Sequence, residues 1–306
     1  MLSFFKLIRY KNLIMVLLTI VLTKYAIINS FTSSVSNFQF ILLTIAILCI
    51  TAGGYIINDI FDVAADKINK PKKVFIDNTI SKKNGFLAYF VLTFLGLTLG
   101  IYASYIKGNS SYSIFFISTI ILLYWYSKSL KRIALVGNSV ISLLTALTIL
   151  IVFIFEVKNT NSSSNIAETI LNFFTSISVT ASVFIYIIFA FFMTLIREII
   201  KDIEDMNGDY ALKMKTLPII IGVNRTKKIV LVISSFIFLF IVIILKEELA
   251  HLPLLFWYAI LFILSPFAWF LYKLFNAKNT KEFHLLSNLI KLIMFFGILS
   301  MLFIKL

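Results

Sequence analysis

Charged, redox-active and metal-ligating side chains are scarce in this chain. Only 14% of its 306 residues are charged, and it contains one cysteine and two histidines. Cys49 lies in an apolar run and has no second thiol to pair with, which excludes a disulfide and redox chemistry. His251 and His284 lack the spacing of metal ligands. No Ser–His–Asp or Cys–His set is visible, so a mechanism through a covalent enzyme intermediate is not expected.

Apolar sequence dominates the chain instead. Hydrophobic residues make up 60% of it, and the mean hydropathy is +0.99. Both values lie outside the range of soluble globular proteins. Apolar stretches of about 20 residues are long enough to cross a bilayer, and they predict an all-α, multi-pass membrane protein with about nine transmembrane helices. These stretches lie at about residues 13–30, 38–58, 86–106, 111–127, 134–156, 172–196, 229–245, 253–272 and 285–304.

The few acidic residues are concentrated in two motifs with the same spacing. Most of the 14 Asp and Glu residues lie within residues 59–77 and 198–209. Positions i, i+3 and i+7 share one face of a helix, so each motif stacks carboxylates that repel one another unless a cation lies between them. This pattern predicts a shared site for Mg²⁺ and a diphosphate. The first motif is Asp59-x-x-Asp62-x-x-x-Asp66, and the second is Asp202-x-x-Asp205-x-x-x-Asp209.

A simpler interpretation is that these acids belong to solvated helix ends and only pair with neighbouring lysines. Ionisable groups near membrane depth are costly and usually functional. A repeated spacing in a chain so poor in acids therefore favours the binding site. The repetition also suggests that residues 1–306 form a single domain made of two related halves, at about 1–133 and 134–306.

The basic residues are distributed unequally among the predicted loops. With the N-terminus inside, most of the 28 Lys and Arg residues fall in inside segments, and few fall outside. Because cytoplasmic loops accumulate Lys and Arg, this pattern predicts that the N-terminus and both acidic motifs lie on the cytoplasmic side of the inner membrane. The polar connector 159–165 then faces outward. The net charge of +14 therefore needs no nucleic acid as a partner.

Basic side chains near the predicted site would bind the diphosphate oxygens that the metal leaves exposed. For any one of them, the alternative is a role in setting topology among lipid headgroups. Tyr124 and Lys128, four residues apart at the end of the fourth predicted helix, are the pair best placed to act at the site. The basic candidates are Arg9, Lys67, Lys72, Lys73, Lys128, Lys131, Arg132 and Lys201.

The two motifs resemble the signatures of the UbiA superfamily of intramembrane prenyltransferases. The run from Asn58 to Asp66 is similar to the first signature and the run from Asp202 to Asp209 to the second. The resemblance extends over nearly the whole chain. It implies a helical bundle with a cytoplasmic-side active site that binds a polyprenyl diphosphate through Mg²⁺ and transfers the prenyl group to an acceptor.

The resemblance also implies roles for individual residues. Tyr124 and Lys128 resemble the Tyr and Lys that lie near the diphosphate, and Arg9 resembles the basic residue of the first helix. The implied catalytic residues are Asp62, Asp66, Asp202, Asp205, Lys128 and Tyr124. The implied metal ligands are Asn58, Asp59, Asp62, Asp66, Asp202, Asp205 and Asp209, and substrate binding falls to Arg9, Asn58, Lys67, Lys72, Lys73 and Lys201.

The acceptor is the open question at this level. The stretches 197–209 and 215–218 are similar to the branch that prenylates a geranylgeranylglyceryl phosphate to form an ether lipid. The chain departs from the usual pattern at residues 73–81, where many members carry an Arg-Pro-x-x-x-Gly-type run. An aromatic acceptor such as 4-hydroxybenzoate or dihydroxynaphthoate is the alternative. A divalent-cation transporter is a more remote one, because transporter carboxylates are expected mid-span rather than beside basic loops.

Overall fold

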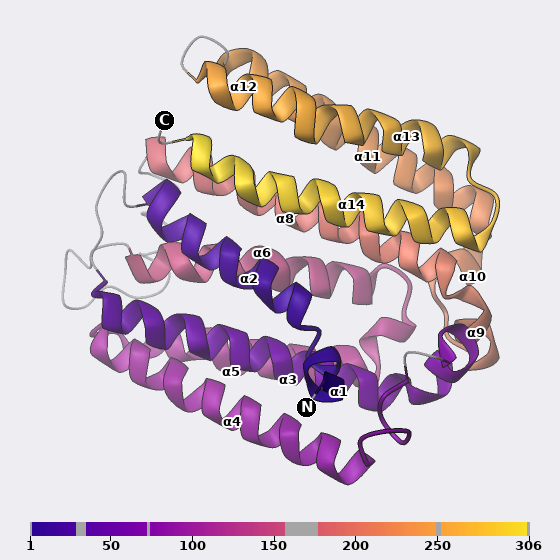
Figure 1. Ribbon diagram of the computed structural model, residues 1–306, viewed down its shortest axis with the longest axis horizontal. Coiled ribbons are helices and arrows are strands. Elements are labelled where there is room, and N and C mark those ends of the chain that lie inside the picture. Colours follow the sequence, from indigo (N-terminus) through magenta and orange to yellow (C-terminus); the bar gives the residue numbers. More distant parts are fainter. Residues whose placement is uncertain (1, 29–34, 72–73, 157–176, 249–251, 305–306) are drawn as a thin grey trace. The chain divides into compact units, whose positions relative to one another are not determined.

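The computed structural model describes residues 2–28, 35–71, 74–156, 177–248 and 252–304 (Figure 1). Within these ranges, nine helical segments are long and apolar enough to span a membrane. The predicted all-α, multi-pass fold class is thereby confirmed. The elements are α1 (Leu2–Leu7), α2 (Tyr10–Leu22), η1 (Thr23–Ile28), α3 (Asn37–Asn69), α4 (Lys82–Ile106), η3 (Ser110–Tyr112), α5 (Ser113–Lys128), η4 (Leu130–Arg132), α6 (Val136–Glu156), α8 (Ile177–Glu204), α9 (Met206–Ala211), α10 (Leu217–Ile221), α11 (Val223–Glu248), α12 (Pro253–Ala259), η5 (Ile260–Leu264), α13 (Ser265–Asn276), α14 (Thr280–Ser300) and η6 (Met301–Phe303).

The helices divide into two compact units. Unit 1 consists of Met1–Leu130 and Leu147–Tyr186, and unit 2 of Lys131–Ala146 and Ile187–Leu306. Two helices, α6 and α8, therefore contribute one end to each unit. The predicted relation between two halves of a single domain concerns internal similarity and stays a prediction.

Unit 1 is built around α3, which packs against α2, α4 and α5. Small residues let these helices approach closely, as is common where membrane helices meet. A Cβ atom at Gly96 on α4 would lie 2.7 Å from Ile50 Cγ1 and 2.9 Å from the Ala46 carbonyl oxygen, both on α3. Near the C-terminal end of α3, a separate apolar cluster contains Leu7, Ile56, Ile57, Ile60, Ile76 and Tyr89.

A buried ion pair joins α6 to the segment between α2 and α3 in unit 1. Lys24, in the π-helical turn η1, lies 2.8 Å from Glu156 Oε1 at the end of α6, and both side chains are 1% exposed. Lys24 Nζ also donates to the Val35 carbonyl at 3.1 Å, while the Val35 amide donates to Glu156 Oε2 at 3.3 Å. Burial lowers the pKa of Lys107, just after α4, to about 8, and the nearby Glu156 carboxylate offsets part of this shift.

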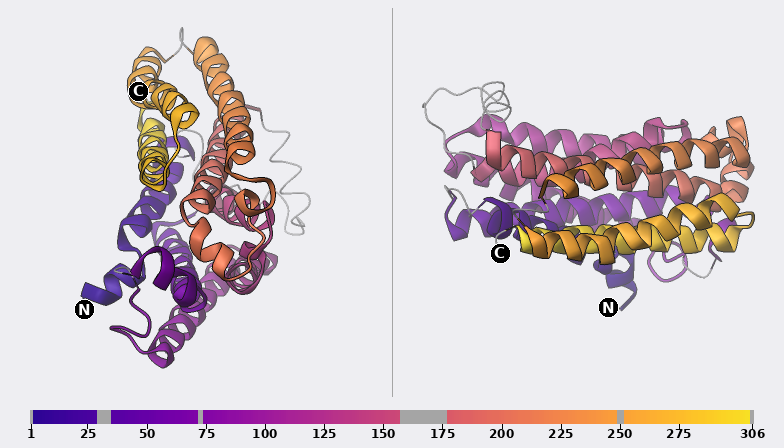
Figure 2. Two further views of the ribbon diagram at one scale, coloured as in Figure 1. Left: turned by 90° about the vertical axis from the view of Figure 1, so that its right-hand side faces the viewer. Right: turned by 90° about the horizontal axis from the view of Figure 1, so that it is seen from above.

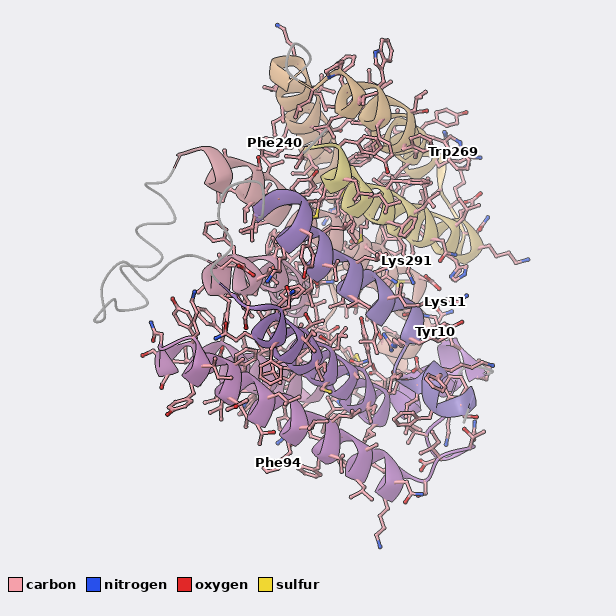
Figure 3. All side chains as sticks on the ribbon, turned by 60° about the vertical axis from the view of Figure 1, so that its left-hand side comes forward. Tyr10, Lys11, Phe94, Phe240, Trp269 and Lys291 are labelled. Atoms are coloured by element: carbon pink, nitrogen blue, oxygen red, sulfur yellow. The ribbon has the colours of Figure 1, made fainter. Side chains whose placement is uncertain are left out.

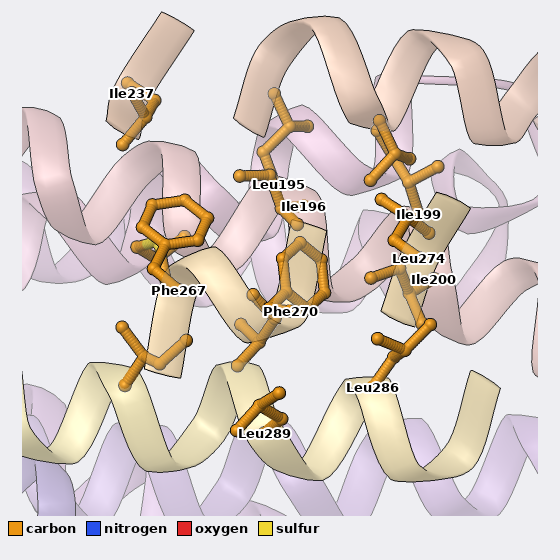
Figure 4. Packing of buried hydrophobic residues seen from close by; sticks show 14 of the residues in the cluster. Leu195, Ile196, Ile199, Ile200, Ile237, Phe267, Phe270, Leu274, Leu286 and Leu289 are labelled. Carbon is orange, nitrogen blue, oxygen red and sulfur yellow. The ribbon is translucent and has the colours of Figure 1, made fainter. Parts of the chain in front are cut away.

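Unit 2 packs α8, α11, α13 and α14 around a second apolar core. Within the unit, the orange-to-yellow helices α11 to α14 have roughly parallel axes, and consecutive spans alternate in direction (Figures 1 and 2). One membrane span is assembled from α12, η5 and α13, with a π-helical turn before Pro266 in the first turn of α13. The core side chains shown in Figure 4 include Ile196, Ile199 and Ile200 of α8, Phe267, Phe270 and Leu274 of α13, and Leu286 and Leu289 of α14.

The outward faces of both units are apolar. Phe94 on α4 and Trp269 on α13 point away from the helices that carry them (Figure 3). Their side chains are 70% and 48% exposed. Extensive exposure of large apolar side chains is costly in water but favourable against lipid tails. The chain is accordingly an integral membrane protein.

At both acidic motifs, the observed helix ends differ from the predicted ones. Helix α3 continues from its predicted end near residue 58 through the first motif to Asn69, so Asp59, Asp62 and Asp66 share one helix as expected. The second motif differs, because α8 ends at Glu204 and Asp205 adopts a turn conformation (φ −94°, ψ 6°) before the short helix α9. Asp, Asn and Gly in residues 205–208 are weak helix formers, and this explains the break.

Candidate substrate-binding site

The first motif presents a row of oxygen atoms along the last turns of α3. Asn58 Nδ2 donates to Asp62 Oδ2 at 2.8 Å, which fixes the orientation of both side chains. The other amide atom, Asn58 Oδ1, is buried and has no hydrogen-bond partner. Asp62 and Asp66 are partly buried. This stretch of α3 therefore carries an acceptor atom that no donor among the described residues satisfies.

Arg9 lies beside the first motif through its contact with Asp59. The residue separates α1 from α2 and has a left-handed backbone (φ 51°, ψ 53°), which turns its side chain toward α3. Its Nη2 atom lies 2.6 Å from Asp59 Oδ1, and its guanidinium stacks on the Tyr55 ring at 5.1 Å. Burial opposes the charge of Arg9, but Asp59 and Tyr55 outweigh it and raise the pKa of Arg9 above its ordinary value. Arg9 therefore stays protonated next to the motif.

Tyr124 and Lys128 approach the same helix from α5. The Tyr124 ring meets the Phe61 ring edge to face, with centroids 6.0 Å apart, and Phe61 immediately precedes Asp62. Lys128 Nζ lies 5.7 Å from the centre of the Tyr124 ring, and its side chain is exposed. Unit 1 thus gathers Arg9, the first motif and Tyr124 around the end of α3.

The other basic candidates of the first half lie on the last turn of α3 and in the segments that follow α3 and α5. Lys67 is exposed on the last turn of α3. Lys131 and Arg132 lie in the turn η4 of unit 2, where the Arg132 carbonyl accepts from the Lys215 amide at 2.9 Å. Lys72 and Lys73 fall outside the described residues, so their predicted role in substrate binding stays a prediction.

The second motif is held by unit 2. Asp202 Oδ2 accepts a hydrogen bond from Asn138 Nδ2 of α6 at 2.9 Å. Asp209 lies in α9 and is 9% exposed, and its carbonyl accepts from the Met214 amide at 2.9 Å. Asp205 sits at the turn between α8 and α9. The three carboxylates therefore come from two helices and the turn that joins them.

Lys201 was predicted to bind substrate, and in unit 2 it lies beside a carboxylate of its own helix. Its Nζ atom is 3.5 Å from Glu198 Oε2. Glu198 Oε1 is 2.8 Å from Arg197 Nη1, so each oxygen of this carboxylate has its own cation. Glu198 lies four residues before Asp202 and so extends the row of acidic residues of the second motif. In the structure, however, its carboxylate pairs with Arg197 and Lys201.

Three further side chains near the second motif escaped the sequence analysis as site residues. Asn138 is a buried polar residue at the start of an apolar span, a signal that could have marked it. Arg197 entered the sequence analysis through the count of basic residues and the resemblance of the stretch 197–209, not as a site residue. His284 Nδ1 lies 2.8 Å from Glu204 Oε1 and connects α14 to the end of α8. No spacing rule relates Asn138 to Asp202 or His284 to Glu204, because these contacts are tertiary.

The oxygen-rich side chains of the two motifs suit Mg²⁺. Among the described residues, no group of three His, Cys, Asp or Glu side chains is placed to hold a metal ion. Mg²⁺ prefers oxygen ligands, and protein sites often supply only one or two carboxylates while substrate phosphates and water complete the shell. The buried Asn58 Oδ1 atom beside Asp62 is an oxygen of this kind. The residues of the motifs therefore fit a magnesium–diphosphate complex.

The fold and the motifs define an intramembrane helical protein with acidic motifs at the ends of spans, and comparison with known proteins gives its family. The chain belongs to the UbiA prenyltransferase family, whose model matches residues 14–299. It is 34% identical over 207 residues to the digeranylgeranylglyceryl phosphate synthase of Sulfurisphaera tokodaii. That match covers 65% of this chain and 66% of the relative, just under two thirds of the relative's length.

Solved structures share the fold over nearly the whole chain. One, from a study of digeranylgeranylglyceryl phosphate synthase in membranes, has a TM-score of 0.62 and 22% identity and covers 99% of this chain and 98% of its own. A UbiA homologue from Archaeoglobus fulgidus bound to GPP and Mg²⁺ has a TM-score of 0.56 at 14% identity and covers 98% of this chain and 99% of its own. At such identities the likeness establishes the fold.

Proposed function

We propose that this protein transfers a geranylgeranyl group from its diphosphate to the hydroxyl of a geranylgeranylglyceryl phosphate, forming an ether lipid. The observation that carries the proposal is the row of oxygen atoms on α3, where Asn58 and Asp62 are hydrogen-bonded and Asn58 Oδ1 is buried without a donor. Family membership supports prenyl transfer, and the curated relative supports the acceptor. Membership of a prenyltransferase family also argues against a cation transporter.

Each acidic motif has a place in this proposal. Metal binding is assigned to Asn58, Asp59, Asp62, Asp66, Asp202, Asp205 and Asp209. When bound, Mg²⁺ neutralises the charge that develops on the diphosphate as it leaves. Arg9, held by Asp59, supplies a fixed cation for the diphosphate oxygens, and Lys128 supplies another beside Tyr124. The allylic carbon–oxygen bond breaks, the acceptor hydroxyl oxygen bonds to that carbon and loses its proton, and apolar walls exclude competing water.

The acceptor assignment is tested by competition. The purified protein is given labelled geranylgeranyl diphosphate and Mg²⁺ together with equal amounts of geranylgeranylglyceryl phosphate and 4-hydroxybenzoate. We expect labelled ether lipid, with little prenylated phenol, when the products are separated by chromatography. Prenylated phenol without ether lipid would overturn the acceptor assignment and leave prenyl transfer standing.

We also propose that both motifs face the cytoplasm, on the strength of the basic residues beside them. A cysteine placed at Asn78, in the exposed loop after α3, should resist a membrane-impermeant thiol reagent applied to intact cells. A cysteine at Ser163, outside the described residues, should react. Cys49 is replaced in both variants. The reverse labelling pattern would invert the topology.

A further inference from the structure

Arg197 on α8 has a hydrogen-bond donor that no group in the described part of the chain satisfies. Its Nη1 atom contacts Glu198 Oε1 at 2.8 Å, while its Nε atom is buried and has no hydrogen-bond partner. A buried donor without an acceptor is destabilising, and more so when it is charged. Folded proteins retain few such groups. The side chain as a whole is 24% exposed, so parts of it other than Nε are accessible to a ligand.

Arg197 shares its carboxylate partner with a second cation. Glu198 is the shared partner of Arg197 and Lys201, with distances of 2.8 Å and 3.5 Å from its two oxygens. Two cations around one carboxylate leave one positive charge uncompensated within the trio. The carboxylate also restrains both cations, which lowers the entropy lost when they bind an anion. The trio itself therefore contains one more cation than carboxylate, and Asp202 follows Lys201 on the same helix.

We propose that Arg197, positioned by Glu198 and assisted by Lys201, binds a phosphate group of a substrate. The guanidinium offers planar donors that match phosphate oxygens. Arg197 precedes Asp202 by five residues, about 7.5 Å along a helix. Arg197 thus lies more than one helical turn before Asp202. The inference rests on the proposed function, which supplies two phosphate-bearing substrates, the diphosphate donor and the phosphorylated acceptor.

Steady-state kinetics of Arg197→Gln and Arg197→Lys test the proposal and identify the substrate. We expect Arg197→Gln to raise the KM of one substrate at least tenfold and to leave the other within about twofold. Arg197→Lys should have a smaller effect, because Lys keeps the charge without the planar fork. If the acceptor phosphate is the ligand, the variants should not impair transfer to geranylgeranylglycerol, which lacks the phosphate. Arg225→Gln, an exposed charge on α11, is the matched control and should change neither KM.

A binding measurement without turnover separates this inference from the proposed function. Thermal stabilisation of the purified full chain by inorganic pyrophosphate and by glycerol 1-phosphate is measured in EDTA, which removes metal-mediated binding at the motifs. We expect at least one probe to stabilise the wild type and Arg225→Gln but not Arg197→Gln. Equal stabilisation of all three proteins, or unchanged KM values in a well-folded Arg197→Gln, would overturn the role of Arg197. Failure of the wild type to form ether lipid would overturn the acceptor assignment alone.

Discussion

Asp62→Asn and Asp205→Asn should each lower prenyl transfer by about 10²- to 10³-fold, the range found when one group that stabilises developing charge is removed. Each substitution keeps the size of the side chain and one of its oxygens while removing a negative charge from a motif. In Asp62→Asn, an amide would face the Asn58 amide that now donates to Asp62 Oδ2. The measurement is transfer from labelled geranylgeranyl diphosphate over a range of Mg²⁺ concentrations.

The matched control for these variants is Asp77→Asn. Asp77 is exposed, lies outside both motifs and has a left-handed backbone (φ 68°) that Asn adopts readily. We expect it to retain near-normal transfer. Unchanged thermal unfolding in all three variants would show that the fold is intact. Near-normal activity of Asp62→Asn and Asp205→Asn at saturating Mg²⁺ would contradict the assignment of both motifs.

Breaking the ion pair between Lys24 and Glu156 should lower the free energy of unfolding of unit 1 and leave the geometry of the substrate-binding site unchanged. Lys24→Met or Glu156→Gln leaves one buried charge without its partner, and such a loss costs about 3–5 kcal/mol. The double substitution removes both charges, so we expect it to cost less than either single change. Because this pair lies near the start of α3 and the first motif near its end, the double variant should retain its KM values.

The test of the ion pair is a double-mutant cycle on unfolding in detergent. Lys246→Met, which removes a lysine near the end of α11 with no ion pair among the described contacts, controls for the loss of positive charge. Additive effects of Lys24→Met and Glu156→Gln would show that the two residues do not stabilise each other.

The motif spacing identified the chemistry of the site, and the contacts of each carboxylate came from the tertiary structure. Asp59, Asp62 and Asp66 lie on one helix, as their spacing predicted. Yet Asp59 is paired with Arg9, fifty residues away, whereas Asp62 is paired with Asn58 on the same helix. The second motif looked like a continuous stripe, but the weak helix formers after Glu204 break it at Asp205. Equal spacing thus produced unequal local geometry.

Hydropathy and charge in the sequence were sufficient to predict the all-α class and the nine spans found among the described residues. A bilayer forces each apolar stretch of sufficient length to satisfy its own backbone as a helix. That constraint is local and can be read along the chain. The partners of the buried polar groups follow another rule. Asn138 meets Asp202 across 64 residues, and Lys24 meets Glu156 across a still longer separation. Such pairs depend on which helix faces pack together, and only the tertiary structure decides that.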